Sequence, residues 1–426
     1  MQPPRFDFCQ YFGFVFLSYC VVPRNQITQN YVQRSVSNSF VTDYEWSSVN
    51  FTWPSRSAYE EALQNGVYVP EHNALIGIKV YKDRMYLALP RLRPGTPITL
   101  ASVPINHQDD INEVGEVPIK RNLLLDPFPS WDMNVKTSCT TLQNVQSMEI
   151  DRRGIMWILD GTRINDFTKC PPKLVLIDLN NNRIVSRHIF TPDIALTEGG
   201  FLNDLVIDES DGGYAYITDN SALDPGLIVY SRKQKRAWKL RDRSMFPELD
   251  ATNFTIDGVR FGALAPIDGI ALSPLNPRRN EERIVYYTAL SGYNLYAISN
   301  RILRNERFCK GDQWRAYVKH VGRKPAITDG MIIDNKGNLF YGLIQSHGIG
   351  KWNIYEYFNT AREVVSNSRE IIWPDSFAMD NSGYLYVLCN GIHKYFDQGH
   401  RLTVSDEVKF RVLKLYTGNK NYMYSP

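Results

Sequence analysis

The sequence predicts an all-β fold, a single six-bladed β-propeller. First, one phrase recurs six times: a polar residue, an apolar strand, an Asp-x-x-Gly-like turn and an aromatic-rich strand. Second, the copies are spaced by about 60 residues, which is longer than a WD40 or kelch repeat. Third, aromatic residues make up 12% of the chain, and flat side chains suit the pleated surface of a sheet.

The clearest copies of the phrase cover residues 329–341 and 375–386. Copies at 146–157 and 203–216 follow the same pattern, whereas those at 78–87 and 268–287 are degenerate. After most copies comes a second apolar strand with a polar turn, so each unit supplies about four strands. The turn-opening residues of the six copies are Tyr81, Asp151, Asp208, Ser273, Asp334 and Asp380.

Closure of the ring is expected at the two ends of the repeat array. Residues 410–416 complete the last blade, and the stretch from Val41 to Trp53 is expected to join it as a closing strand. No Pro-, Gly- or Ser-rich linker divides the repeats, so residues 25–426 are expected to form one propeller with a core of roughly 60–415. The alternative, a set of β-sandwich domains, predicts no repeated Asp-x-x-Gly register.

Charge and composition exclude some partner classes. Lys and Arg number 48 against 45 Asp and Glu, and no long run of one sign occurs, so nucleic acid is not an expected partner. Residues 11–22 are apolar and follow Arg5, a length that fits the core of a signal peptide better than a spanning helix. We therefore expect residues 1–24 to be a cleaved signal and the mature chain to be secreted, without a membrane anchor; a buried strand or an uncleaved anchor is the alternative.

The cysteines and the glycosylation motifs agree with secretion. Four cysteines remain after the signal, and an even number in a secreted chain favours two disulfides with three possible connectivities. The preferred pairs are Cys139–Cys170 and Cys309–Cys389, because each pair is nearer in sequence than the alternatives. Two Asn-x-Thr motifs make Asn50 and Asn253 candidate glycan acceptors.

Polar residues begin the innermost strands, five positions before each turn-opening residue. This ring of amides and carboxylates would line the channel mouth; it comprises Gln146, Asn203, Asp268, Asp329 and Asp375, with Ile76 at the first-blade position and Asn73 nearby. Thr328, beside Asp329, is a further candidate ligand residue. Three inward carboxylates would raise one another's pKa unless a cationic amine or a metal ion lay between them. The alternative is structural, because such Asp residues also bond to backbone amides and Asp-Gly also forms turns.

Other candidate motifs are weaker. The aspartates at the turn-opening positions, Asp151, Asp208, Asp334 and Asp380, precede glycines and are expected to cap turns. His72, His347 and His393 show no paired metal spacing and are expected on the surface or in turns, although the loop bearing His347 could overhang the channel. No nucleophile elbow, P-loop, HExxH or dinucleotide motif occurs, and we predict no metal site and no cofactor. The recurrent aromatics are expected mainly to pack between blades.

Several phrases together resemble the yellow/major royal jelly protein family. They include the segments 88–97 and 124–131, the Gly154-to-Gly161 phrase with Trp157, the Cys170-Pro-Pro-Lys phrase, and the segments 226–230, 269–274 and 340–353. The order is preserved over roughly residues 60–415, and the resemblance implies a secreted six-bladed propeller. The chain departs from the common pattern at Arg153 and Lys351, where a cysteine is expected, which indicates a divergent branch.

The resemblance and the polar ring lead to three functional hypotheses. The preferred one is binding of a small aromatic amine or catechol derivative at the channel, linked to pigmentation or amine scavenging. The second is a dopachrome-converting isomerase or decarboxylase, in which Asp268, Asp329 or Asp375 moves a proton while Asn203 and Gln146 stabilise developing charge. The third is a metal-dependent lactonase of the senescence-marker type, which would require a Glu from the first blade; Ile76 argues against it, although Glu71 is near.

Overall fold

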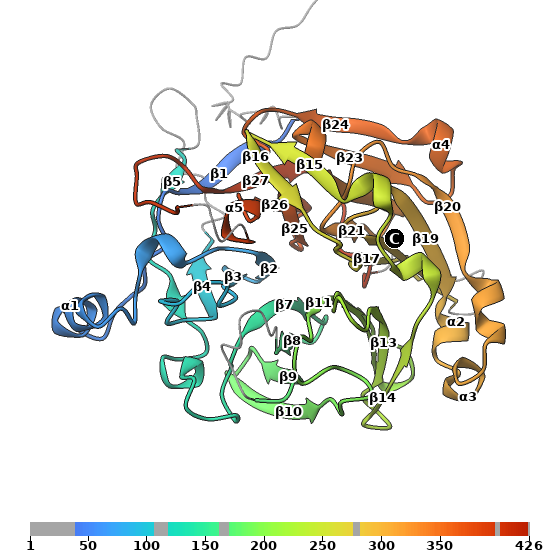
Figure 1. Cartoon of the computed structure of the whole chain (residues 1–426), viewed down its shortest axis with the longest axis horizontal. Helices are drawn as coiled ribbons and strands as arrows, with labels where there is room; N and C mark the ends of the chain where they lie inside the picture. The colour runs from blue at the N-terminus through green and yellow to red at the C-terminus, as the bar shows by residue number, and fades with distance from the viewer. Residues whose placement is uncertain (1–38, 106–117, 162–169, 276–281, 397–400, 425–426) are drawn as a thin grey trace, which may run out of the picture. The chain divides into compact units, whose positions relative to one another are not determined.

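The computed structural model describes residues 39–105, 118–161, 170–275, 282–396 and 401–424. Its sheets form the six blades of a β-propeller around a central axis (Figure 1). The predicted signal peptide, residues 1–24, lies outside the described residues. None of the helices in the ranges given above is long and apolar enough to span a bilayer.

The first three blades are four-stranded antiparallel sheets, each running outward from the axis in chain order. Blade 1 contains β2 (Gly77–Tyr81), β3 (Arg84–Ala88), β4 (Leu100–Pro104) and β6 (Asp126–Pro127). Blade 2 contains β7 (Val145–Ile150), β8 (Ile155–Asp160), β9 (Lys173–Asp178) and β10 (Arg183–Ile189). Blade 3 contains β11 (Leu202–Asp208), β12 (Tyr214–Asp219), β13 (Gly226–Ser231) and β14 (Arg236–Leu240).

Blades 4 and 5 repeat this order, and blade 6 closes the ring. Blade 4 contains β17 (Ile267–Leu272), β18 (Ile284–Ala289), β19 (Asn294–Ser299) and β20 (Lys319–Arg323). Blade 5 contains β21 (Met331–Ile333), β22 (Asn338–Leu343), β23 (Gly348–Asn353) and β24 (Glu363–Asn367). Blade 6 contains β25 (Pro374–Met379), β26 (Tyr384–Cys389), β27 (Phe410–Tyr416) and β1 (Val41–Trp46), with the short parallel strand β5 (Lys120–Arg121) at its edge.

The closing strand is β1, as predicted. It pairs antiparallel with β27, so that Val41 lies opposite Lys414 and Trp46 opposite Phe410. A strand from the start of the repeat array thereby completes the last sheet, which ties the two ends of the ring together. The helices of the described residues are short: α1 (Arg56–Gln64), α2 (Asn300–Leu303), α3 (Glu306–Cys309), α4 (Phe358–Ala361) and α5 (His393–Phe396).

Burial explains the repeated sequence pattern. The second strand of blade 3, β12, is buried at all six positions, whereas the outermost strand of blade 2, β10, alternates between half-buried and exposed residues. Inner strands lie between neighbouring sheets and are apolar on both faces, while an outer strand is solvated on one face. The recurrent aromatics are packed in this layer, as predicted; Tyr86, Trp157, Tyr216, Tyr287, Tyr341 and Tyr386 are all buried.

The turn aspartates have the predicted role. Asp151 accepts hydrogen bonds from the backbone N–H groups of Arg153 and Ile155, both at 3.0 Å. Asp334 and Asp380 accept the equivalent pairs of bonds in blades 5 and 6. Asp208 accepts one such bond, from Ser210, and is also paired with Arg304. These carboxylates fix the tight turns between the first and second strands.

One of the two predicted disulfides is present and the other is wrong. Cys139 and Cys170 are joined, with their Cα atoms 5.3 Å apart. Cys309 and Cys389 are buried free thiols. Cys309 lies in α3, beyond the third strand of blade 4, and Cys389 ends β26 in blade 6, so the whole of blade 5 separates them. Nearness in sequence fails as a guide here because the chain winds around the axis between the two cysteines.

The six inner strands form a closed ring, because each one contacts the inner strands of both neighbouring blades. Two glycines allow the closest approaches. A Cβ atom on Gly269 would overlap the carbonyl oxygen of Asp329, and one on Gly330 would overlap that of Asp375. Each Asp-Gly pair therefore places a carboxylate on one inner strand and brings the next blade's backbone against it.

Gly330→Ala is expected to destabilise the fold by about 1–3 kcal/mol or more, because the added methyl group meets backbone that cannot rotate away. The measurement is the free energy of unfolding from urea titration. Gly262→Ala is the matched control, since a Cβ atom there meets no heavy atom within 4 Å. Equal stability of the two variants would contradict this account of the ring.

Candidate functional site

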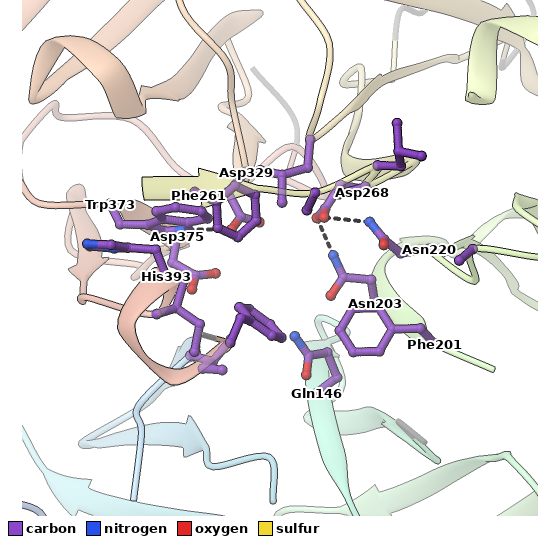
Figure 2. Close-up of a pocket in the computed structure, with 18 of the residues that line it drawn as sticks. Gln146, Phe201, Asn203, Asn220, Phe261, Asp268, Asp329, Trp373, Asp375 and His393 are labelled. Atoms are coloured by element: carbon purple, nitrogen blue, oxygen red, sulfur yellow. Dashed lines mark hydrogen bonds between the residues drawn. The ribbon is translucent and has the colours of Figure 1, made fainter. Parts of the chain in front are cut away.

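A cavity of about 520 Å³ opens at the end of the ring where the inner strands begin (Figure 2). The predicted ring residues Gln146, Asn203, Asp268, Asp329 and Asp375 all line it, together with the apolar Ile76 of the first blade. Figure 2 shows their side chains converging on a common space from different blades. The structure thus brings these five polar residues together around one cavity.

Irregular strand pairing positions several of these side chains. The register between the first and second strands shifts at Gln146, at Asn203, at Asp268 and at Asp375. A bulge leaves a residue unpaired and redirects its side chain. The register shift in each of these four blades therefore directs a polar side chain away from the sheet and into the cavity.

Two asparagines hold the carboxylate of Asp268. The Nδ2 group of Asn203, on the inner strand of blade 3, donates to one oxygen. The Nδ2 group of Asn220, directly after β12, donates to the other oxygen at 2.7 Å and to the carbonyl of Pro266 at 3.3 Å. Asp268 is only 3% exposed, so both of its oxygens depend on neutral amide donors.

Trp373 orients Asp329. Its indole Nε1 donates to the Oδ2 atom of Asp329 at 2.6 Å. The backbone of Trp373 has a φ of 47°, in the left-handed region that bulky residues seldom occupy. Its ring is stacked on His393, with the ring centroids 5.5 Å apart, and meets Phe261 edge-on at 5.2 Å. The strained residue thus supplies both a donor to the carboxylate and part of an aromatic wall.

Asp375 is fixed by an amide from its own blade. The Nδ2 group of Asn390, directly after β26, donates to the Oδ2 atom of Asp375 at 2.7 Å and to the carbonyl of Leu75 at 2.9 Å. Asn390 therefore also links blade 6 to the first blade at the seam where the ring closes. None of the ion pairs found among the described residues involves Asp268, Asp329 or Asp375.

Burial and mutual repulsion raise the pKa values of all three carboxyl groups. Burial raises the pKa of Asp268 well above its usual range, and the neighbouring Asp329 and Asp375 raise it further. Burial also raises the pKa of Asp375, with a further contribution from Asp329. Burial raises the pKa of Asp329 to about 6, while hydrogen bonds from Trp373 and Asp268 hold it lower than its neighbours. Asp268 and Asp329 act on each other in opposite directions: Asp329 raises the pKa of Asp268, whereas Asp268 lowers that of Asp329.

Further charges lie deeper along the channel. Asp204 accepts a hydrogen bond from the Ser147 hydroxyl at 2.8 Å, and the Nζ atom of Lys79 lies 3.4 Å from a carboxylate oxygen of Glu149. Burial raises the pKa values of Asp204 and Glu149, and Lys79 opposes the rise in both. Asp204 in turn raises the pKa of the three carboxyl groups in the cavity. The half-buried Lys79 therefore faces an excess of acidic groups.

A hairpin forms one wall of the cavity mouth. β15 (Asn253–Ile256) and β16 (Val259–Gly262) form a separate two-stranded sheet inserted before blade 4. Residues 260–265 line the cavity, and Phe254 and Phe261 pack against Trp373. Asn253, one predicted glycan acceptor, is exposed on this hairpin. The other, Asn50, is half-buried and accepts bonds from the backbone of Phe51 and the indole of Trp53.

One member of the predicted set does not belong to the cavity. Thr328 is fully buried, and its hydroxyl donates to the backbone carbonyl of Gly342 at 2.8 Å, so this side chain has a structural partner within blade 5. Gln146 is the opposite case: it is 6% exposed, and its Oε1 atom has no hydrogen-bond partner among the residues that the structure describes. An unpaired buried acceptor facing a cavity is satisfied when a ligand or water brings a donor.

The sequence matches a family model described as major royal jelly protein over residues 143–421. The chain belongs to the major royal jelly protein family. It is 26% identical over 358 residues to the protein named yellow of Drosophila erecta, covering 81% of this chain and 63% of that protein. It is 22% identical over 397 residues to the dopaminechrome tautomerase of Drosophila melanogaster, covering 87% of this chain and 80% of that one. The resemblance predicted from the sequence is confirmed, and this chain spans about 63% of the length of the yellow proteins it matches.

Solved structures of other proteins also align with this family member. A regucalcin from Agrobacterium tumefaciens, described as a calcium-binding protein, aligns with a TM-score of 0.43 and 10% identity, over 82% of this chain and 91% of that one. A luciferin-regenerating enzyme aligns with a TM-score of 0.44 and 12% identity, over 82% and 93%. In the part of the major royal jelly protein chain that the structure describes, no three His, Cys, Asp or Glu side chains are grouped to hold a metal ion.

The two positions at which this chain departs from the family pattern carry basic residues that form ion pairs. Arg153 bonds to Asp151 at 3.0 Å, and Lys351 bonds to Glu363 at 2.8 Å across the outer strands of blade 5. Both basic side chains are partly or largely exposed. Surface ion pairs therefore take the positions where a family cysteine is expected, and the remaining disulfide is Cys139–Cys170.

Several residues of this site are missing from the sequence prediction. His393 is expected on the surface or in a turn, but it is 1% exposed and stacked on Trp373. Asn220 and Asn390 both follow the last residue of a second strand, as does Leu290, which also lines the cavity. Aligning the residue that directly follows the second strand of each repeat could have identified this position as part of the site. The aromatic wall lies in an insertion and a loop outside the repeat, so no periodic signal marks it.

The raised pKa of Asp329 predicts a pH effect on stability. A carboxyl group with a raised folded-state pKa binds its proton more tightly in the folded protein, so its contribution is complete below pH ~4 and is lost as the pH rises through about 6. We expect the free energy of unfolding of the unliganded protein to fall between pH 4.5 and 7, and Asp329→Asn to reduce that fall by about 1–3 kcal/mol. Urea titrations at both pH values measure this.

Asp132→Asn, an exposed aspartate outside the cavity, is the control for this pH effect. The proposed electrostatics are wrong if wild type, Asp132→Asn and Asp329→Asn share the same pH slope.

Proposed function

We propose that this member of the family binds a small aromatic amine or catechol derivative in the cavity. The observation that carries the proposal is the set of three buried carboxyl groups with no cationic partner among the described residues. An ammonium group placed among them would relieve their repulsion and donate hydrogen bonds to their oxygens. Nothing else in the described lining offers a compensating charge at that depth.

The remaining walls suit an aromatic ligand. Trp373, Phe261 and Phe201 line the cavity, and flat rings pack against a ligand ring or lie over a cation. The unpaired Oε1 atom of Gln146 can accept a hydrogen bond from a hydroxyl or ammonium group. A volume of about 520 Å³ falls in the range of small-molecule sites.

Secretion is part of the same proposal. It is supported by the family assignment and by the Cys139–Cys170 disulfide, since disulfides persist in oxidising compartments. A role in pigmentation or amine scavenging is likewise proposed, with support from the relative named dopaminechrome tautomerase and from the chemistry of the cavity. Recovery of the protein from the medium of expressing eukaryotic cells tests secretion directly, and retention inside the cells would contradict it.

Dopamine binding is the direct test of the cavity. Titration calorimetry at pH 7.5 is expected to show saturable binding, and Asp329→Asn to weaken it by about tenfold to a hundredfold, because a charge-assisted hydrogen bond is lost. Asn keeps the shape of the side chain and an acceptor for Trp373. Asp132→Asn is the matched control and is expected to bind like wild type. If Asp329→Asn binds dopamine with wild-type affinity, this carboxylate is not part of a binding site.

One observation favours a second candidate, a tautomerase. Asp268 and Asp329 line the same cavity, and burial raises the pKa of both. The pKa of Asp329 rises to about 6, while Asp329 raises the pKa of Asp268 further, so Asp268 suits the role of acid and Asp329 that of base. A tautomerase removes a proton from carbon and returns one to oxygen, which needs a base and an acid in reach of the same ligand. The metal-dependent hydrolase gains no such support, because the first-blade position expected to hold a Glu is the apolar Ile76.

Loss of dopaminechrome absorbance, with and without protein, tests the tautomerase. Catalysis is expected to fall by about a hundredfold or more in Asp329→Asn, since proton transfer by a positioned group contributes at least that much. Asp132→Asn again serves as the control. A decay rate that is the same with and without wild-type protein would eliminate the enzyme while leaving the binding proposal intact.

A further inference from the structure

The mouth of the cavity carries a charge opposite to that of its depth. Among the residues that line the cavity, Arg260 of β16 is the one with a permanent positive charge; the titratable groups facing the same space are Asp268, Asp329, Asp375 and His393. The lining therefore holds acids on the inner strands and an arginine on the inserted hairpin.

The Nε atom of Arg260 is held by a hydrogen bond, whereas the terminal amino groups of its guanidinium are available to a ligand. Its Nε atom donates to the Oδ1 atom of Asn253 across the hairpin at 2.8 Å. The side chain is exposed, and its two terminal amino groups form no ion pair or hydrogen bond with the residues that the structure describes. Fixing Nε leaves the planar end of the guanidinium with its donors available, and that geometry matches the two oxygens of a carboxylate.

A ligand that carries an amine but no carboxylate forms no favourable interaction with Arg260. A cation at the mouth opposes the entry of a purely cationic ligand, whereas a ligand that carries both charges can satisfy both parts of the lining. Its ammonium group would lie among the acids, its ring against Phe261 and Trp373, and its carboxylate at Arg260. These three groups occur together in an aromatic α-amino acid.

We propose that Arg260 is a specificity-determining residue that recognises a ligand carboxylate, and that the ligand class is an aromatic α-amino acid. The inference rests on the proposed binding function and names the substrate class of that same site. It adds the requirement that the ligand carry a carboxylate, which the three cavity carboxyl groups alone do not impose.

L-Dopa and dopamine test this directly, because they differ only by the carboxylate. In calorimetric titrations at pH 7.5 and low salt, wild type is expected to bind L-dopa about fivefold more tightly than dopamine, the scale of one exposed arginine–carboxylate contact. Arg260→Gln is expected to remove that preference while changing dopamine affinity by less than about twofold. Arg260→Lys, which keeps the charge but not the fork, is expected to retain only part of it.

Arg183→Gln is the matched control, since Arg183 is an exposed arginine at the start of the outer strand β10 and does not line the cavity. It is expected to keep the wild-type preference. If wild type binds both ligands equally, or if Arg260→Gln weakens both equally, the role of Arg260 is overturned while the binding function stands. If wild type binds neither ligand, the proposed function itself fails, and this inference fails with it.

Discussion

The close contact between neighbouring inner strands is the constraint on which the rest of this structure depends. Where Gly269 and Gly330 lie, the backbone of one blade touches the backbone of the next, and no side chain larger than hydrogen fits between them. That contact sets the width of the ring and therefore the separation of the acidic groups that precede each glycine. The fold and the cavity are specified by the same dipeptides, so neither can change without the other.

The cavity is costly to the unliganded protein. Three carboxyl groups are held in one buried space by neutral donors, from Asn203, Asn220, Asn390 and Trp373, and not by cations. A salt bridge would stabilise the fold more directly, but it would also occupy the charge that a ligand needs. The left-handed backbone of Trp373 adds a second local cost at the same place. Strain and unpaired charge concentrated in one cavity are typical of sites kept for binding or catalysis.

The sequence allows the periodic part of this architecture to be predicted, and little beyond it. The repeat of strand, turn and strand locates the blades, the closing strand and the polar ring, because each depends on residues at a fixed spacing. The wall formed by Trp373, Phe261 and His393 comes from an insertion and from loops, where only three-dimensional packing brings the residues together. The Cys309–Cys389 prediction failed for a related reason: distance along a chain that winds around an axis says little about distance across it.

The pairing of β1 with β27 has a consequence for the order in which this protein matures. Glu45 and Arg411, which interact across that seam, are separated by 366 residues. On the ribosome β1 must wait for its partner β27 while five blades are synthesised, and the sixth sheet is completed last. That sheet and the loops beside it carry Asp375, Asn390, Trp373 and His393. The cavity is thus among the last features to form, and a chain that lacks the sixth blade has five blades but an incomplete cavity.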